Sequence, residues 1–149
     1  MNVQLNKSAF DFLGFSLTKC SYLRTFESGR PVKLFVVVNN VNEKQNKIVE
    51  LNVRIEITFE NETTSKFDYL SQFIINDRKW YETANKENQN LGISNLFSLC
   101  FPYIRASVSA ITNDSFGEIF LPVINVLKGD ITKGVTFLTS LATQRKKGV

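Results

Sequence analysis

Side chains that could support covalent chemistry are scarce and dispersed in this chain. The 149 residues include no His, and the two cysteines, Cys20 and Cys100, have no neighbouring thiol or imidazole. Histidine is the commonest catalytic base and a frequent metal ligand, and neither a glycine-rich phosphate loop nor a nucleophile elbow is present. We therefore expect no enzyme, no metal site and no cofactor, and interpret both thiols as buried structural groups.

The charge of the chain is weakly basic and spread out. The net charge is +4 and the pI is about 9.1, and the basic residues cluster only at Arg145, Lys146 and Lys147. This balance permits weak attraction to nucleic acids, acidic membranes or acidic proteins, but no basic stripe alternates with aromatic residues. We predict one domain over residues 1–144 and a basic tail over 145–149, and expect no nucleic-acid partner. A salt-dependent shift with single-stranded DNA would support the opposite.

No export signal or membrane anchor is expected. The first 30 residues contain no basic flank followed by a continuous apolar run, and no window of about 20 apolar residues occurs. With 43% apolar residues, the chain can bury a single core. We expect a cytoplasmic protein that does not insert into membranes.

The chemistry that the sequence does offer is apolar contact. It contains 13 Phe, and several apolar residues fall where a core role is hard to assign. One group lies between Tyr22 and Pro31, in a segment that ends in turn-forming residues. Another lies between Ile119 and Val126, a run too apolar for an ordinary loop and interrupted by Pro122. Exposed aromatic side chains give large contact areas at low entropic cost, which suits binding of another polypeptide.

Alternating apolar residues predict the elements that must position these segments. The period of two predicts four antiparallel strands, near residues 10–22, 32–38, 51–59 and 67–75, with a bulge near Gly14 in the first and a polar turn over Asn39–Asn46. A strand of twelve residues spans roughly 40 Å, so a long helix or a second subunit must cover the sheet.

Two helices are expected after the strands. Apolar residues from Ile93 to Ile111 follow the helical period for about five turns, with a kink at Pro102. Ile131, Val135, Leu138 and Leu141 predict a shorter C-terminal helix. The predicted class is α+β, with a four-stranded antiparallel sheet packed against one long kinked helix and the shorter helix.

Two strings in the second half of the chain carry a family resemblance. They are Leu99-Cys100-Phe101-Pro102-Tyr103-Ile104-Arg105 and Leu121-Pro122-Val123-Ile124-Asn125. Together with the order of strands, long helix, apolar linker and short helix, these strings resemble the SecB family of protein-export chaperones. The resemblance implies a SecB-like fold and an ATP-independent holdase, which binds unfolded polypeptides without chemical turnover.

The resemblance also implies an assembly and a client-binding region. The family forms homotetramers, built as dimers of dimers with the long helices between two sheets, so Phe101, Pro102, Tyr103 and Arg105 are expected to shape the oligomer interface. The family's client groove maps onto the first strand connection, the linker and the last helix. The candidate client-binding residues, including two aromatics after residue 79, are Tyr22, Leu23, Phe26, Trp80, Tyr81, Phe120, Leu121, Val123, Phe137, Leu138 and Leu141.

The partners implied by the resemblance divide into several possibilities. The family docks onto the motor protein SecA through acidic residues on the sheet, here Glu56, Glu60 and Asp68, but the positive net charge weakens that expectation. Unfolded preproteins and an antitoxin of a toxin–antitoxin system are both expected clients. The alternative is a non-catalytic protein that reuses the fold to capture one specific folded partner.

Overall fold

The chain folds into a long sheet with one long helix lying across it. The computed structural model describes residues 8–44, 47–87, 90–124 and 131–138. In chain order the elements are β1 (Phe10–Ser21), β2 (Pro31–Lys44), β3 (Ile48–Phe59), β4 (Thr64–Ile75), α1 (Arg78–Glu87), α2 (Leu91–Ile111), the 3₁₀ turn η2 (Ile131–Lys133) and β5 (Val135–Phe137). The α+β class is confirmed, and the described sheet has five strands in place of the four expected.

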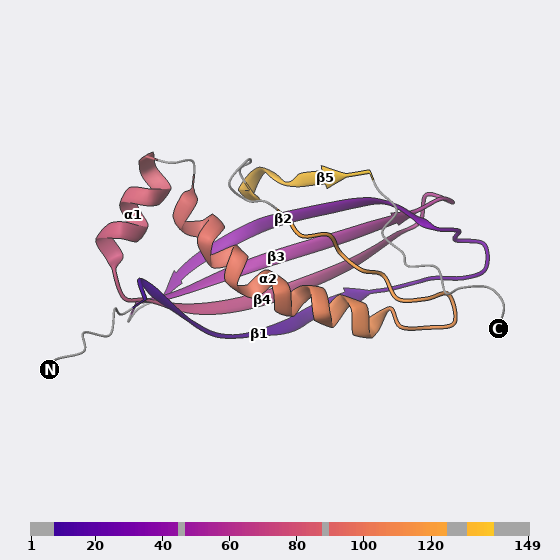
Figure 1. The fold of residues 1–149 in the computed structure, drawn as a ribbon, viewed down its shortest axis with the longest axis horizontal. Coiled ribbons are helices and arrows are strands. Elements are labelled where there is room, and N and C mark those ends of the chain that lie inside the picture. The colour runs from indigo at the N-terminus through magenta and orange to yellow at the C-terminus, as the bar shows by residue number, and fades with distance from the viewer. Residues whose placement is uncertain (1–7, 45–46, 88–89, 125–130, 139–149) are drawn as a thin grey trace, which may run out of the picture.

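The sheet is antiparallel, with strand order β1-β4-β3-β2-β5. β1 and β2 are consecutive in the chain but lie on opposite sides of the β3–β4 pair. The connection between them, residues 22–30, therefore crosses the end of the sheet (Figure 1). β5 pairs with the outer edge of β2 and runs toward that same end.

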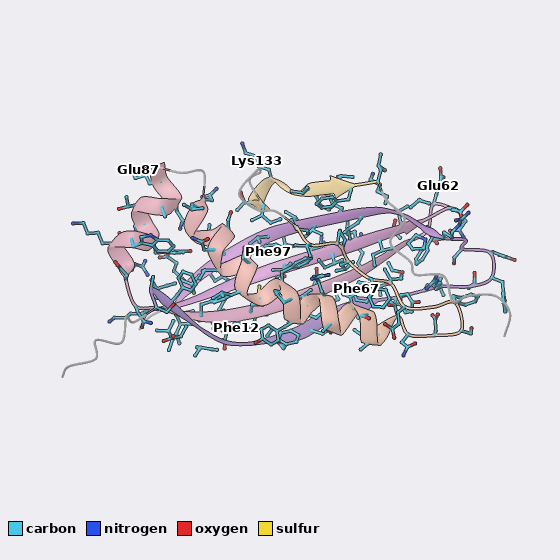
Figure 2. All side chains as sticks on the ribbon, viewed as in Figure 1. Phe12, Glu62, Phe67, Glu87, Phe97 and Lys133 are labelled. Carbon is cyan, nitrogen blue, oxygen red and sulfur yellow. The ribbon has the colours of Figure 1, made fainter. Side chains whose placement is uncertain are left out.

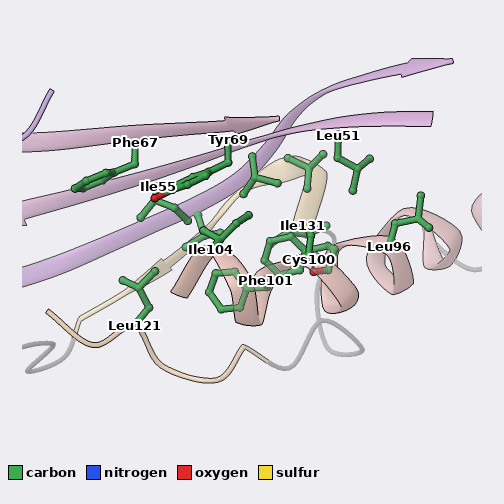
Figure 3. Packing of buried hydrophobic residues seen from close by; sticks show 14 of the residues in the cluster. Leu51, Ile55, Phe67, Tyr69, Leu96, Cys100, Phe101, Ile104, Leu121 and Ile131 are labelled. Atoms are coloured by element: carbon green, nitrogen blue, oxygen red, sulfur yellow. Dashed lines mark hydrogen bonds between the residues drawn. The ribbon is translucent and has the colours of Figure 1, made fainter. Parts of the chain in front are cut away.

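The core lies between one face of the sheet and α2. Figure 3 shows Leu51, Ile55 and Tyr69 pointing from the strands toward Phe101 and Ile104 of α2. These side chains are at most 4% exposed, and each contributes roughly 1.5–3 kcal/mol by leaving water. The predicted long helix is confirmed, with Pro102 inside it. Its axis bends along its length in Figure 1, which agrees with the expected kink.

The predicted bulge in the first strand is confirmed, and a second one follows it. The register between β1 and β4 shifts between Phe12 and Gly14, and again between Leu17 and Lys19. Without the first shift, Phe12 and Phe15 would point to opposite faces of the sheet. With the shift, both lie on the α2 side, because their partners Phe73 and Ser71 share that face.

Two features of the structure, in β2 and at α1, differ from the sequence prediction. The segment Asn39–Lys44 was predicted as a turn, but it continues β2 and pairs with residues 48–52 of β3. Helix α1 was not predicted, because it is mostly polar and only Tyr81 and Ala84 are buried. Asp77 caps its first turn by accepting a hydrogen bond from the Trp80 N–H at 3.0 Å.

The predicted C-terminal helix is wrong for the residues that the structure describes. Gly134 has φ +81°, and a Cβ atom there would lie 2.3 Å from Cζ of Phe35. The chain therefore leaves the 3₁₀ turn and passes into β5, whose three residues pair with Leu34, Phe35 and Val36 of β2. β-branched and aromatic residues suit this strand. Leu141 lies outside the described residues, as does the predicted tail over 145–149.

Candidate protein-binding surface

The β1–β2 connection is a hydrogen-bonded turn that displays Phe26. The Ser28 N–H donates to the Thr25 carbonyl at 3.1 Å, and the Thr25 N–H donates to Oγ of Ser28 at 2.9 Å. Gly29 closes the turn with φ +76° against the side chain of Glu60. Phe26 is nevertheless 93% exposed. A large aromatic ring is thus presented to solvent by an ordered backbone.

The same connection is fixed to the end of the β3–β4 hairpin. The Leu23 N–H donates to Oγ of Ser65 at 3.2 Å, and the Asn61 N–H donates to the Ser28 carbonyl at 3.2 Å. Ser28 and Ser65 are buried. Leu23, by contrast, is 62% exposed. The hydrogen bonds therefore hold the backbone while leaving the apolar side chains of Leu23 and Phe26 in solvent.

Arg24 links this connection to the turn after α2. Its side chain is only 4% exposed, and its Nη1 atom donates to the Gly117 carbonyl at 2.7 Å. The guanidinium lies 5.7 Å from the ring centroid of Phe59 and 5.5 Å from that of Phe116. Cation–π contacts of this kind contribute roughly 0.5–2 kcal/mol. The Nε–H finds no acceptor among the described residues, a cost of about 1–3 kcal/mol that these contacts offset.

Two further contacts join the connection to that turn. The Tyr22 hydroxyl donates to Oδ2 of Asp114 at 2.6 Å. The pKa of Tyr22 is raised to about 12, mainly by burial and to a smaller extent by this hydrogen bond to a carboxylate. The rings of Phe26 and Phe116 form an edge-to-face pair with centroids 5.0 Å apart. Tyr22 is therefore half-buried as a structural contact, whereas Phe26 keeps most of its surface free.

The linker after the turn alternates between buried and exposed residues. Leu121 is 2% exposed, and its carbonyl accepts a hydrogen bond from Nε of Arg105 at 3.0 Å. Phe120 and Val123, on either side of it, are 47% and 80% exposed. The prediction of Leu121 as a client-binding residue is wrong, because its side chain belongs to the core in Figure 3. Phe120 and Val123 remain available at the surface.

Exposed apolar side chains come from three segments, which are the β1–β2 connection, the linker and the residue after β5. Phe137 of β5 is half-buried, and Leu138 immediately after it is 77% exposed. Figure 1 shows the β1–β2 connection at one end of the molecule, the linker running from that end back along the sheet, and β5 directed toward the same end. We call the following side chains the apolar end surface. They are Leu23, Phe26, Phe120, Val123 and Leu138.

The two aromatics predicted after residue 79 lie away from this surface. Figure 2 labels Glu62, in the β3–β4 turn, and Glu87, at the end of α1, at opposite ends of the molecule. Tyr81 in α1 is 1% exposed, so its prediction as a client-binding residue is wrong. Trp80 is half-buried with its ring 5.7 Å from that of Phe10, beside a shallow hollow of about 400 Å³.

The string Phe101–Arg105 divides between the core and the surface. Phe101 is 4% exposed and stacks on Phe97 at 4.8 Å, so it is not free to contact another subunit. Pro102 is exposed and Tyr103 is 53% exposed, with the Tyr103 ring 5.2 Å from that of Phe12 on β1. A second apolar patch, which the sequence did not indicate, combines Tyr103 with Leu99 one turn earlier on α2 and with Phe15, whose ring centroid lies 5.9 Å from that of Tyr103. Leu17, on the same sheet face as Phe15, is also exposed.

The opposite face of the sheet carries acidic residues that are already neutralised. The three predicted partner-docking residues all have a basic partner. The pairs are Arg54–Asp68 at 2.8 Å, Lys66–Glu56 at 3.5 Å and Arg30–Glu60 at 3.6 Å. Arg54 binds both carboxylate oxygens of Asp68 from the directly opposite position on β3. These three carboxylates therefore offer a basic partner little uncompensated negative charge.

Comparison of the chain with protein-family models, with curated proteins and with solved structures finds no match. Within the described ranges, neither helix combines the length and hydropathy that crossing a membrane requires. The same residues contain no cluster of three or more side chains suited to holding a metal ion.

The cysteines differ from the expectation of two buried thiols, since Cys100 is buried but Cys20 is exposed.

Proposed function

We propose that this chain is an ATP-independent holdase of the cytoplasm that binds unfolded or non-native polypeptides, as do members of the SecB family that it resembles. The observation that carries the proposal is the apolar end surface. Its side chains come from the β1–β2 connection and the linker, which are two of the regions that the resemblance assigns to client binding, and from the residue after β5, where the last helix was expected. They are 47% to 93% exposed on a chain with a well-packed core.

Binding of this kind needs contact area and no reactive group. Unfolded chains expose apolar side chains, and covering one large side chain of the surface contributes roughly 1.5–3 kcal/mol. A single site would therefore bind weakly. Several copies of the surface on one oligomer raise the effective concentration for the next client segment, which favours long unfolded chains over compact ones.

The proposed assembly is a homotetramer, a dimer of dimers. The second apolar patch, which combines Tyr103 and Leu99 of α2 with side chains of β1, supports a contact between copies of the chain. We expect Tyr103→Arg to give a smaller species by light scattering during size-exclusion chromatography, because it places a charge in the patch. Thr83→Arg, an exposed change on α1, is the control and should leave the mass unaltered.

The charge pairs on the open face of the sheet bear on the partners. Glu56, Glu60 and Asp68 each neutralise a cation within the chain. This arrangement disfavours docking onto SecA and favours service as a dedicated chaperone, for example of an antitoxin, over general export. Preproteins remain the alternative clients.

A second candidate function is capture of one specific folded partner. The hydrogen-bonded turn that carries Phe26 supports this candidate, because a rigid protruding ring suits a preformed pocket. Fluorescence anisotropy with one labelled protein, presented folded and then permanently unfolded, separates the two. The holdase binds the unfolded form and ignores the folded one. Failure to bind unfolded chains, with tight binding to a single folded partner, would leave only the second candidate.

A further inference from the structure

We infer that Arg24 is the positioning residue that joins the β1–β2 connection to the turn after α2, and thereby places two segments of the proposed client-binding surface relative to each other. The inference rests on the proposed function. It assigns a role to a residue that does not contact the client itself but acts through its neighbours. The side chain of Arg24 is buried, whereas its neighbours Leu23 and Phe26 are exposed. Its role would be to fix their place relative to Phe120.

The two segments are distant in sequence and meet through few side chains. The Nη1 atom of Arg24 donates to the carbonyl of Gly117, 93 positions later in the chain, at 2.7 Å. Its Nη2 atom donates to the Phe116 carbonyl at 3.4 Å. The guanidinium is planar and presents donors in a fixed fork, so it sets both the separation and the orientation of the two backbones. An apolar contact would set neither as strictly.

The arrangement around the guanidinium orients the exposed rings. The Phe116 ring contacts both the Arg24 guanidinium, 5.5 Å from its centroid, and the Phe26 ring, with which it forms an edge-to-face pair at 5.0 Å. Asp114 lies 3.8 Å from Nη1 of Arg24 and accepts the Tyr22 hydroxyl bond at 2.6 Å. Arg24 thus joins the connection that carries Leu23 and Phe26 to the turn that precedes Phe120, and so links two of the three segments that contribute to the apolar end surface. Without it, each segment would keep its apolar residues but lose their fixed spacing.

Arg30 provides a matched control within the same connection. Its side chain is 66% exposed and pairs with Glu60 at 3.6 Å, so it has the same charge but no contact with the turn after α2. Arg24→Gln and Arg30→Gln each remove one positive charge from the connection. Only the first removes the bridge between the two segments.

The test compares client affinity with stability. We expect Arg24→Gln to weaken binding of a labelled, permanently unfolded protein about tenfold, and Arg30→Gln to leave it within twofold of wild type. Loss of the Arg24 contacts should also lower Tm, so a control must separate lower stability from lost positioning. The control is a core variant at the far end of the sheet, either Ile75→Val or Ile75→Ala, whichever has a Tm equal to that of Arg24→Gln. The matched core variant should bind as wild type. Amide hydrogen exchange should accelerate in 22–30 and 112–120 for Arg24→Gln alone.

The outcomes separate the inference from the proposed function. If wild type binds but Arg24→Gln binds equally well, or no more weakly than the Tm-matched core variant, the positioning role is refuted and the holdase stands. If wild type binds no unfolded chain, the proposed function fails and the positioning role with it. Should Arg24→Gln not fold, Tyr22→Phe removes one hydrogen bond between the same segments. It should weaken binding in the same direction, and unchanged binding would refute the inference.

Discussion

Truncating Phe26 should remove client affinity while leaving the fold intact. The ring is 93% exposed, so Phe26→Ala exposes almost no new apolar surface in the free protein. The contact that it loses is the edge-to-face pair with Phe116 at 5.0 Å, which is worth at most roughly 0.5–1.5 kcal/mol. We expect the free energy of unfolding to change by less than that amount.

The effect on binding should be much larger than the effect on stability. A client that covers the ring gains roughly 1.5–3 kcal/mol, and each 1.4 kcal/mol corresponds to a factor of about ten in Kd. Phe26→Ala should therefore weaken binding of a short apolar peptide roughly tenfold to a hundredfold. A short peptide is the appropriate ligand, because avidity across several subunits would mask the loss.

The assay is fluorescence anisotropy of the labelled peptide, with urea unfolding as the measure of stability. Phe26→Leu, which keeps an apolar side chain, should retain most of the affinity. Glu27→Ala, an exposed change at the next position of the same connection, should have no effect on the affinity. Binding of Phe26→Ala within twofold of wild type would show that the Phe26 ring does not contact the client. A loss of stability above about 2 kcal/mol would show instead that the ring belongs to the core.

Three further predictions concern the sheet face, the thiols and alkaline pH. Asp68→Asn weakens the two charge-assisted hydrogen bonds from Arg54 and should cost about 1–3 kcal/mol in urea unfolding; a cost below about 0.5 kcal/mol would contradict the pairing. Ellman's reagent at pH 8 should modify only Cys20 in the native protein, because Cys100 is buried and its pKa is raised to about 11; two rapidly reacting thiols would contradict the buried site. The raised pKa of Tyr22, about 12 against an ordinary 10, means that its contribution to stability is complete below pH 10 and declines as pH rises toward 12. The stability difference between wild type and Tyr22→Phe should therefore shrink over that range, and a constant difference would contradict the hydrogen-bonded phenol.

The sequence predicts the elements whose pattern is local and strong. Alternation in β3 and the stripe of α2 from Ile93 onward reflect one buried face each, and both elements are confirmed. The bulge near Gly14 was predictable because the apolar parity changes there. The C-terminal segment was not, because Ile131, Val135 and Leu138 also fit a helical stripe. Their true state depends on the free edge of β2, about 100 residues earlier in the chain.

The candidate surface was predictable only in part. Apolar residues without a core role, such as Phe26 and Val123, are indeed exposed. Tyr81 and Leu121 are buried, because burial within a short helix or an extended linker depends on which face meets the core. Arg24 gave no local signal, since its partners at Phe116 and Gly117 follow more than 90 positions later. Distant contacts of this kind arise only in the folded chain.

The most direct test of the account is suppression of aggregation without nucleotide. A chemically denatured, aggregation-prone protein is diluted into buffer lacking ATP, with and without this protein at near-stoichiometric amounts, and light scattering is followed. We expect lower scattering for two clients that are unrelated in sequence, and a weaker effect for Phe26→Ala than for Glu27→Ala. Scattering that is unchanged for both clients would contradict the holdase function.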